Sequence, residues 1–535
     1  MSQAARHLRP GGPDPCITAT RRQLAAAREV CRDKLGNHQV WLASNRGPVE
    51  LFQDNEQTLQ RKGHGGMASA LRAFGQVTSV CWVACAMNST ERQAMRARGG
   101  NLRISGPDSC IDLSLVTPKQ EEYARYYDVI ANGVLWLLQH QANHAPTHPT
   151  FDDTLWKAWQ WGYERVNQLF SEHLRASVRR SGQPPVFLVQ DYHLYLLPGL
   201  LRDGFPDAPI LHFTHIPWPG PDTWRQLPRD IRNAIFSQML KSDLIGFHAT
   251  RYIKNFLHGC EELLGLPVDR KQNLVKAHGR WVRVRAYPIS VDPCALKRHA
   301  ESPEVLQAQA QLCRHEREKL IVVIARTDPS KNLVRTLRGY DYFLTQSPEW
   351  RTRVRLVALL PLSRQSNELY RDYGEELCKM AERINNTWKQ GTWRPLHLWL
   401  EHNYEQGIAL LKNYDVLVVN SLSDGMNLVA KEGPVINACS GALILSENTG
   451  AYQELKDACH VINPFDIQGF CEALNEALSE HPAKRQWAQD RQRQTISEST
   501  IYRWIQEQLD ELLTPVTREC RALQPSRDPF RSRSD

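Results

Sequence analysis

Short apolar runs alternate with longer amphipathic stretches along most of the chain from residue 39 onward. Each run is apolar at successive positions and is short enough for one β-strand. Continuous apolar strands are typical of a parallel sheet buried on both faces and joined by helical crossovers. The pattern therefore predicts a doubly wound α/β fold. The runs are residues 40–43, 186–189, 210–213, 244–247, 320–325, 354–360, 416–419 and 443–445.

Changes in this pattern predict the division of the chain into parts. The beginning is rich in glycine and proline, and helix formers at 18–34 then predict an appended helix, to which we assign no chemistry. Pro288 and Pro293 bracket an extended segment, after which a new series of strands and helices starts. A charged helical stretch follows the last strand and precedes a polar tail. The predicted parts are residues 1–36, 37–290, 291–482, 483–515 and 516–535.

Composition narrows the class of protein. With 66 Lys and Arg against 58 Asp and Glu in 535 residues, the net charge is a mild +8, and 41% of residues are hydrophobic. No apolar run is long enough to span a membrane, and no cationic block with interleaved aromatics indicates a nucleic-acid groove. The thirteen cysteines lack framework spacing. We expect a cytoplasmic globular protein that binds small anionic molecules but neither membrane nor nucleic acid, with a homo-oligomer left open.

Polar residues follow the strands of the first half, where open α/β sheets bind their ligands. The glycine-rich loop 63–66 opens a helix and could bring backbone N–H groups, Gly66 among them, to a phosphate or sugar oxygen. Asp191 follows the run 186–189, and His215 follows the run 210–213. This pair could hold hydroxyl groups or serve as acid and base. A plain turn, a capping Asp and a buried His remain the alternative interpretation.

The second half predicts a site for a sugar nucleotide. Arg326 and Lys331 lie five residues apart after the run 320–325, so both could reach one diphosphate beside a helix N-terminus. A surface ion pair is the alternative. After the run 416–419, Asp424 and Gly425 make a turn, and Glu432 lies two turns into the expected helix. Such a loop offers N–H donors for phosphate and a carboxylate for ribose hydroxyls.

Several common motifs are missing from the sequence. It contains no Walker-type phosphate loop, no Gly-x-Ser-x-Gly elbow, no His-Glu-x-x-His helix and no Gly-x-Gly-x-x-Gly fingerprint, which argues against a dehydrogenase. Cys81 and Cys85 form the only close cysteine pair, and no second pair accompanies them. We therefore expect no bound metal ion.

Taken together, nine short motifs between residues 39 and 510 resemble the trehalose-6-phosphate synthases of glycosyltransferase family 20. Each motif is modest alone, and their common order makes the resemblance specific. The motifs are Asn45-Arg46, Gly65-Gly66, Asp191-Tyr192-His193-Leu194, 215–219 (His-Ile-Pro-Trp-Pro), 243–248 (Asp-Leu-Ile-Gly-Phe-His), 326–331, Ser363-Arg364, 424–432 and 463–466 (Asn-Pro-Phe-Asp).

The resemblance implies a GT-B fold, in which two Rossmann-like domains face a cleft and a C-terminal helix crosses back to the first domain. It assigns a sugar-phosphate acceptor to residues 37–290 and a nucleotide-sugar donor to residues 291–482. The acceptor residues it implies are Arg46, Tyr127, Trp136, Asp191 and Arg364. The donor residues are Gly66, His215, Arg326, Lys331, Asp424, Gly425, Met426, Asn427, Leu428, Val429 and Glu432. The pattern alone would make the stretch around Tyr127 and Trp136 an ordinary amphipathic helix.

The implied reaction moves glucose from UDP-glucose or GDP-glucose to glucose 6-phosphate with retention of configuration, forming α,α-trehalose 6-phosphate without a cofactor. Arg326, Lys331, Asp191 and His215 are the implied catalytic residues. The two cations would stabilise the departing phosphate where other transferases use a divalent ion. No paired carboxylate suggests a glycosyl nucleophile, so front-face attack is expected. No Asp-x-Asp-x-Thr run of a fused phosphatase occurs, so the product should keep its phosphate.

Departures from the family pattern cluster around the donor. Ser423 stands where an Arg is usual, and Gly433-Pro434 and Asn448-Thr449-Gly450 also differ. The nucleotide base and the donor ring therefore stay open. One alternative is a pseudo-glycosyltransferase that joins a nucleotide-cyclitol to an aminocyclitol phosphate, and another is a glucosylglycerol-phosphate synthase. A third is a non-catalytic sugar-phosphate sensor, although Arg326, Lys331 and Glu432, which a sensor could lose, are all present.

Overall fold

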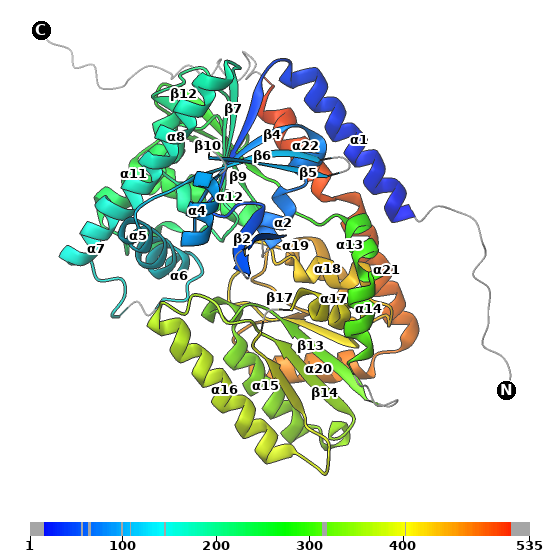
Figure 1. Ribbon diagram of the computed structural model, residues 1–535. Helices are drawn as coiled ribbons and strands as arrows, with labels where there is room; N and C mark the ends of the chain where they lie inside the picture. Colours follow the sequence, from blue (N-terminus) through cyan, green and yellow to red (C-terminus); the bar gives the residue numbers. More distant parts are fainter. Residues whose placement is uncertain are drawn as a thin grey trace, which may run out of the picture.

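The computed structural model contains two large β-sheets, each flanked by helices, one above the other in Figure 1. It describes residues 15–54, 57–62, 66–97, 100–106, 109–143, 146–312, 318–401 and 403–514. The glycine-rich loop before Gly66, the start of the N-terminal extension and the polar tail 516–535 lie outside these residues. None of the helices in the described ranges is long and apolar enough to cross a membrane.

The first sheet has ten strands in the order β10-β11-β12-β9-β8-β7-β1-β4-β6-β5. Its strands pair in parallel from β12 to β6, and antiparallel pairs close both edges. The bounds are β1 Gln39–Ala43, β4 Val80–Cys85, β5 Asn101–Gly106, β6 Ser109–Val116, β7 Pro185–Gln190, β8 Ile210–Phe213, β9 Leu244–Phe247, β10 Val268–Asp269, β11 Leu274–Ala277 and β12 Arg280–Ala286. A hairpin of β2 Val49–Asp54 and β3 Gln57–Lys62 stands apart.

The second sheet has six strands in the order β15-β14-β13-β16-β17-β18, all parallel. Side chains of β13 alternate between two hydrophobic clusters, with Leu320 and Val322 in one and Ile321 and Val323 in the other. Burial on both faces is the physical reason for continuous apolar runs. The bounds are β13 Lys319–Ile324, β14 Val354–Leu359, β15 Leu396–Trp399, β16 Val416–Val419, β17 Ala442–Ser446 and β18 His460–Ile462.

The eight apolar runs all form central strands of these sheets, so the predicted doubly wound α/β fold is confirmed. One missed strand is β4, although it is apolar, buried and inside the first sheet. The other missed strands either carry polar residues, as β5 and β10 do, or lie at a sheet edge, as β15 and β18 do. Their pattern does not differ from that of loops, because a strand buried on one face alone needs only every second residue to be apolar.

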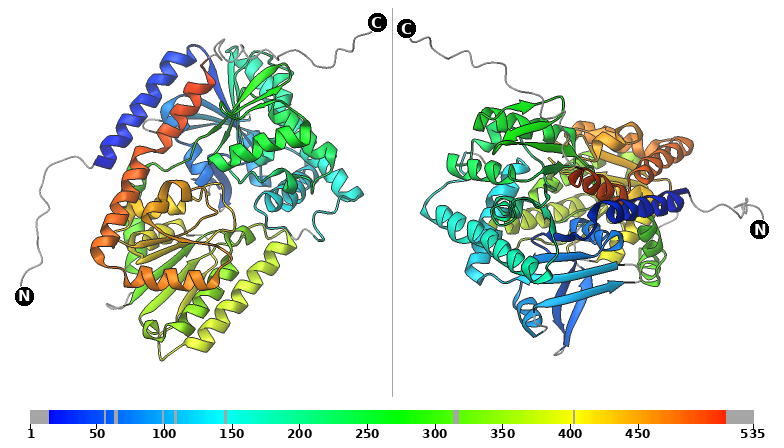
Figure 2. Two further views of the ribbon diagram at one scale, coloured as in Figure 1. Left: turned by 180° about the vertical axis from the view of Figure 1, so that it is seen from behind. Right: turned by 90° about the horizontal axis from the view of Figure 1, so that it is seen from above.

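Helices surround both sheets (Figure 2). Those of the first half are α1 Pro15–Leu35, α2 Gly66–Leu71, α3 Phe74–Val77, α4 Ser89–Ala97, α5 Gln120–Ala124, η1 Arg125–Leu135, α6 Trp136–Gln139, α7 Asp153–Ala158, η2 Trp159–Glu164, α8 Arg165–Ser181, η3 Tyr192–Leu194, α9 Leu197–Arg202, α10 Pro221–Trp224, α11 Arg229–Met239 and α12 Thr250–Leu264. Those of the second half are α13 Pro293–Ala300, α14 Pro303–Ala310, η4 Pro329–Lys331, α15 Leu333–Gln346, η5 Pro348–Trp350, α16 Glu368–Trp388, α17 Tyr404–Asn413, α18 Val429–Ile436, α19 Tyr452–Leu455, η6 Lys456–Ala458, α20 Ile467–Ser479, α21 Pro482–Glu498 and α22 Ile501–Leu512.

The C-terminal helical stretch crosses back to the first sheet as expected, and it is divided at Ser499 and Thr500 into two helices. α21 lies beside the second sheet and α22 beside the first (Figures 1 and 2), where Trp504 packs 5.1 Å from Phe213 between ring centroids. Gln23 of α1 fills the break between them. Its amide donates to the Ser497 carbonyl at 2.9 Å and accepts from the Thr500 hydroxyl at 2.6 Å. The helix expected in the N-terminal extension thus holds the joint through which the chain returns to the first sheet.

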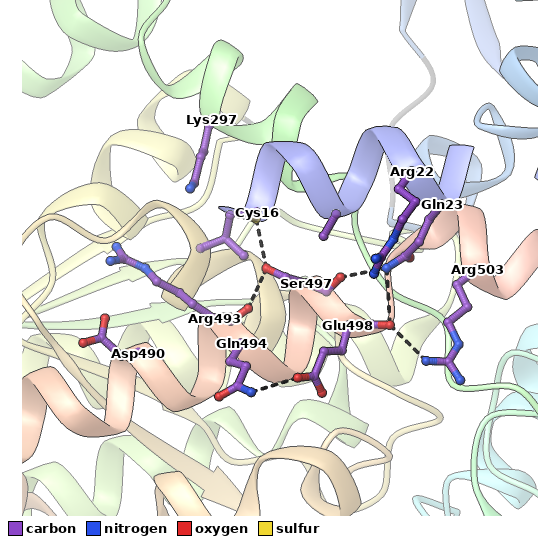
Figure 3. Close-up of a pocket in the computed structure, with 12 residues that line it drawn as sticks. Cys16, Arg22, Gln23, Lys297, Asp490, Arg493, Gln494, Ser497, Glu498 and Arg503 are labelled. Atoms are coloured by element: carbon purple, nitrogen blue, oxygen red, sulfur yellow. Dashed lines mark hydrogen bonds between the residues drawn. The ribbon is translucent and has the colours of Figure 1, made fainter. Parts of the chain in front are cut away.

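A groove of about 720 Å³ opens at this joint between α1, α13 and α21 (Figure 3). Two of the arginines that line it already have partners within the protein. Arg493 donates to the carbonyls of Pro434 and Asn437, and Arg503 donates to Glu507 at 2.7 Å. The groove therefore owes its shape to contacts that fix the helices, and the residues predicted from sequence lie elsewhere.

Candidate active site

The predicted site residues follow the carboxyl ends of strands in both sheets, and these ends face each other. Trp136 from the first half donates its indole Nε1–H to Asp328 of the second half, with 3.3 Å between nitrogen and oxygen. Tyr252 of α12 donates to the Asp424 carbonyl at 2.7 Å. Asp424 follows β16, and Asp328 follows β13. The two sheets thus build one region from both halves of the chain.

Tyr127 lies in an unusual helix, and Trp136 is the first residue of α6, which follows that helix directly. The stretch 125–135 is a π-helix, η1, and not the ordinary amphipathic helix that the pattern alone predicted. A π-helix is wider than an α-helix and is common at functional sites. Arg46, three residues after β1, donates to the Tyr127 hydroxyl at 3.2 Å. Burial would raise the pKa of Tyr127, but the charges of Arg46 and Arg364 lower it to about 8. Two arginines from different sheets therefore act on one phenol.

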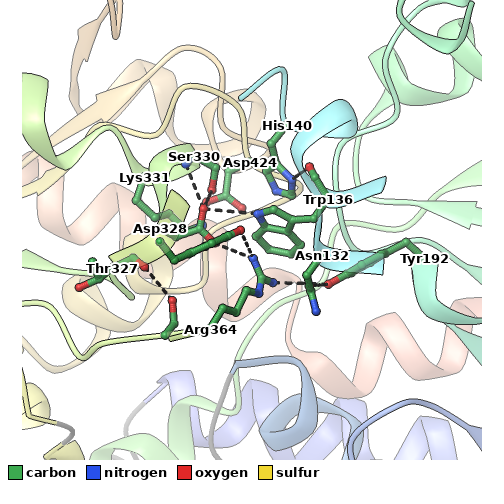
Figure 4. Close-up of polar contacts among 12 residues, drawn as sticks. Asn132, Trp136, His140, Tyr192, Thr327, Asp328, Ser330, Lys331, Arg364 and Asp424 are labelled. Atoms are coloured by element: carbon green, nitrogen blue, oxygen red, sulfur yellow. Dashed lines mark hydrogen bonds and ion pairs between the residues drawn. The ribbon is translucent and has the colours of Figure 1, made fainter. Parts of the chain in front are cut away.

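The Trp136 indole lies under the guanidinium of Arg364, 4.1 Å from the ring centroid (Figure 4). Arg326 is 5.5 Å from the same ring. Arg364 has a left-handed backbone conformation, with φ of 51°, and its Nη1 donates to Asp328 at 3.0 Å and to the Tyr370 hydroxyl at 2.5 Å. Its side chain is 7% exposed. These contacts hold one indole and two guanidiniums together across the two halves.

Asp191 and His215 meet, as neighbouring strand ends should. Asp191 also adopts a left-handed conformation, with φ of 74°, and its carboxylate accepts the backbone N–H of His215 at 3.0 Å. Burial raises the pKa of Asp191 to about 7, against the opposing effects of hydrogen bonds from His215 and Tyr192 and the charges of Arg326 and Arg364. Burial also holds the pKa of His215 well below its ordinary value, and its Nε2 lies 2.9 Å from the Gln190 side-chain oxygen.

Lys331 is paired with Asp424, with 2.5 Å between the ammonium nitrogen and Oδ2. Both side chains are largely buried. Burial alone would raise the pKa of Asp424, but Lys331 lowers it to about 2, so the carboxyl of Asp424 is ionised at neutral pH. Lys331 does not contact Arg326 or share its partner. Sequence spacing placed the two cations on one loop, and the fold brings Asp424 to one of them and Trp136 to the other.

The loop after β16 approaches the first sheet very closely. A Cβ atom on Gly425 would lie 1.9 Å from the His215 carbonyl oxygen, so only glycine fits there. Asn427 has φ of 74°, Met426 is buried, and Leu428 and Val429 are half-buried. α18 starts only at Val429. Glu432 is therefore in the first turn of its helix and not two turns in, as the sequence suggested. Burial raises the pKa of Glu432 to about 7.

Sequence reasoning missed three residues that contact this region. They are Asp328, Tyr370 and Arg251, which donates from α12 to the Asn448 carbonyl at 2.6 Å. Only Asp328 gave a signal, as a carboxylate between two cations on one loop. Gly66 is the first residue of α2, in agreement with the prediction that a helix begins at the glycine-rich loop. Within the described ranges, no group of three or more His, Cys, Asp or Glu side chains could hold a metal ion.

Comparisons with known proteins agree with this arrangement. The family model of glycosyltransferase family 20 matches residues 38–514. The α,α-trehalose-phosphate synthase (UDP-forming) of Botryotinia fuckeliana is 31% identical over 83% of this chain and 83% of its own. The validamine 7-phosphate valienyltransferase of Streptomyces hygroscopicus subsp. jinggangensis is 30% identical over 89% of this chain and 94% of its own. The crystal structure of an α,α-trehalose-phosphate synthase (UDP-forming) from Burkholderia xenovorans in complex with glucose-6-phosphate is similar, with a TM-score of 0.77 and 25% identity over 89% of this chain and all of that one.

Two doubly wound domains that face each other and a C-terminal helix that returns to the first domain define a GT-B glycosyltransferase. The chain belongs to glycosyltransferase family 20. The resemblance drawn from nine motifs to the trehalose-6-phosphate synthases of this family is confirmed. The predicted domain boundaries and the roles of the individual residues stay predictions.

The close approach at Gly425 gives a first test. Gly425→Ala should lower the transfer rate by about 10²-fold, because the added methyl must push two loops apart by about 1 Å or more. Gly220→Ala is the matched control, since a Cβ atom on Gly220 would have no other atom within 4 Å. Steady-state rates of the two variants and the wild type decide the matter. Equal rates for all three would show that the contact does not position the reacting groups.

The buried carboxyl of Asp191 predicts a pH-dependent stability. Its pKa rises from an ordinary value of 3.8 to about 7 on folding, so the folded protein holds this proton more tightly than the unfolded chain does. The stabilisation is complete below pH 3.8 and is lost as the pH rises to about 7. The Asp191→Asn variant has no carboxyl at this position, so its stability does not fall in this way as the pH rises. Its melting temperature minus that of the wild type should therefore be larger at pH 8 than at pH 5, and a constant difference would contradict the assignment.

Proposed function

We propose that this protein is a retaining glucosyltransferase that moves glucose from a nucleoside-diphosphate-glucose to glucose 6-phosphate and forms α,α-trehalose 6-phosphate. The observation that carries the proposal is the convergence of Arg46 and Arg364, from opposite halves of the chain, beside Tyr127 and Trp136. Two guanidiniums suit a phosphate dianion, and the aromatic rings suit the face of a sugar. The relative from Burkholderia xenovorans, whose structure is described as a complex with glucose-6-phosphate, supports this acceptor.

In this proposal the donor lies against the second domain. Lys331 and Arg326 would face its diphosphate, Glu432 its ribose, and the loop 424–429 its sugar and phosphates. Gly66 and His215 would complete the pocket from the first domain. The positive φ at Asn427 and the late start of α18 leave backbone N–H groups at a helix N-terminus, which favours anions. The UDP-forming relatives support a nucleotide-glucose donor.

Charge development explains the catalytic assignment. Breaking the anomeric C–O bond puts negative charge on the departing diphosphate, and cations already in place stabilise it without rearrangement. Two carboxylates of this region are paired with cations, Asp424 with Lys331 and Asp328 with Arg364, and among the described residues no two carboxylates there form a pair suited to a glycosyl nucleophile. Attack of the acceptor hydroxyl from the leaving-group side would therefore retain the configuration. In that step the C–O bond to the phosphate breaks, the new glycosidic bond forms, and the leaving phosphate oxygen takes the hydroxyl proton.

A second candidate is favoured by one comparison. The relative from Streptomyces hygroscopicus is named a validamine 7-phosphate valienyltransferase, so a family member can act on cyclitols. The pseudo-glycosyltransferase alternative keeps the same phosphate site but replaces the donor glucose by an unsaturated cyclitol. The positions that depart from the family pattern, such as Ser423 and Asn448, belong to the proposed donor loops and would distinguish a glucose donor from a cyclitol donor.

One activity screen tests the proposal. The purified chain is given UDP-glucose, GDP-glucose or ADP-glucose with glucose 6-phosphate, and the products are identified by NMR and by phosphate release. Trehalose 6-phosphate that keeps its phosphate and has both anomeric bonds in the α configuration supports the proposal. Turnover of a nucleotide-cyclitol with an aminocyclitol phosphate, and of no glucose donor, would favour the second candidate. No turnover of either pair would favour a sensor.

A further inference from the structure

The side chain of Asp328 lies where the two halves of the chain meet, and its residue is 0% exposed. Its Oδ1 accepts the Trp136 indole N–H at 3.3 Å and both the backbone N–H and the hydroxyl of Ser330, at 3.0 and 2.8 Å. Its Oδ2 accepts Nη1–H of Arg364 at 3.0 Å (Figure 4). One carboxylate therefore joins the π-helix region of the first domain, the loop after β14 and its own turn η4.

The charges around Trp136 show why a carboxylate is needed there. Arg364 and Arg326 lie 4.1 Å and 5.5 Å from the centroid of the same indole ring, so two like charges lie close together, and the Arg364 side chain is only 7% exposed. Such an arrangement is unstable without a nearby negative charge. Burial alone would raise the pKa of Asp328, but Arg364 and Arg326 lower it, so the carboxyl is ionised at neutral pH.

We propose that Asp328 is a positioning residue that fixes the Trp136 indole and the Arg364 guanidinium in the geometry that receives the acceptor. This inference rests on the proposed function, because Trp136 and Arg364 are acceptor residues only if a sugar phosphate binds there. Asp328 itself would not touch the substrate. Its turn also carries Arg326 and Lys331, so the acceptor pocket is built from the loop that faces the donor.

A competing effect makes the direction of the test informative. If Asp328 only neutralised part of the positive charge of Arg364, removing the charge of Asp328 would strengthen binding of the acceptor phosphate and lower the acceptor KM. If Asp328 positions Arg364, removing its charge lets the two guanidiniums separate, and KM rises. The two accounts predict changes of opposite sign.

Asp328→Asn is the appropriate variant, because it keeps an oxygen that can accept from Trp136 and Ser330 while it removes the charge opposite Arg364. We expect the KM for glucose 6-phosphate to rise by about tenfold or more, as for loss of one charge-assisted hydrogen bond. The dissociation constant of the nucleotide-glucose donor, measured by calorimetry, should stay within about twofold. A general loss of structure would instead change both.

The chain offers a matched control. Asp341 accepts from Arg383 at 2.9 Å and from the Trp388 indole at 2.7 Å, so it also joins an arginine to an indole, but on the outer helices α15 and α16. Asp341→Asn should leave both constants unchanged. A double variant with Arg364→Ala gives a second readout: if Asp328 acts through Arg364, adding Asp328→Asn changes the acceptor KM no further.

If Asp328→Asn does not fold, Trp136→Phe tests the same contact from the other side, since it keeps an aromatic ring and removes the N–H. The acceptor KM should rise and donor binding should persist. An unchanged or lower acceptor KM in the folded variants, or equal losses for donor and acceptor, would overturn the inference while leaving the proposed function intact. A wild-type protein that turns over no nucleotide-glucose with glucose 6-phosphate would overturn both.

Discussion

Arg326→Ala and Lys331→Ala should each lower turnover by about 10²- to 10³-fold, the usual loss when one charge that stabilises a transition state is removed. The donor dissociation constant should worsen much less, because the leaving phosphate gains its extra charge only as the bond breaks. Arg326 is exposed and lies over Trp136, whereas Lys331 is half-buried beside Asp424. Arg326 is therefore the cleaner of the two variants.

Lys331→Ala has a second consequence that must be separated from catalysis. Asp424 loses the cation that holds its pKa at about 2, and a buried carboxylate without a partner destabilises the fold. Thermal unfolding of the variant measures this loss. Arg338→Ala is the control for surface charge, since this arginine of α15 is half exposed and pairs with Glu376 at 3.3 Å. Equal losses in donor binding and in turnover would show that Arg326 and Lys331 hold only the ground state.

Arg364→Ala and Arg46→Ala should raise the KM for glucose 6-phosphate by about 10- to 100-fold each, the range for hydrogen bonds to a charged group. Arg46 follows β1 in the first sheet and Arg364 follows β14 in the second, yet both charges act on Tyr127. A phosphate bound by both would bridge the domains. Lysine cannot reproduce the planar fork of N–H donors, so Arg364→Lys should recover little of the loss.

The measurement is a titration of glucose 6-phosphate at a fixed, saturating nucleotide-glucose concentration. Glucose without its phosphate should be a very poor acceptor for the wild type and should gain nothing from either variant. Arg371→Ala is the control, because this arginine of α16 is exposed and its guanidinium donates to the Gln365 carbonyl at 2.9 Å. Identical saturation curves for the wild type and both site variants would show that the acceptor phosphate binds elsewhere.

Most strands that are buried on both faces could be predicted from sequence, because such burial leaves a local mark, although β4 was missed. In β13, every residue from Leu320 to Val323 packs into one of two hydrophobic clusters, so no polar position interrupts the run. The break between α21 and α22 left only a weak mark. Ser499 and Thr500 are residue types that favour helix ends, and Thr500 is the N-cap of α22. The joint itself depends on Gln23, which lies more than 470 residues away in sequence. Local propensity carries no information about a distant partner.

The sequence alone also placed the candidate ligand-binding side chains at strand ends, since parallel strands expose their carboxyl ends at one edge of a sheet. That reasoning located Asp191, His215, Arg326, Lys331 and Asp424, and the ordered motifs predicted the family. Which of these side chains touch was decided only by the tertiary structure. The pairing of Lys331 with Asp424, the stacking of Arg364 on Trp136 and the bridge through Asp328 all join residues from different loops. Electrostatic attraction and ring contacts act through space over a few ångströms, and the chain distance between such partners leaves no local pattern for the sequence to show.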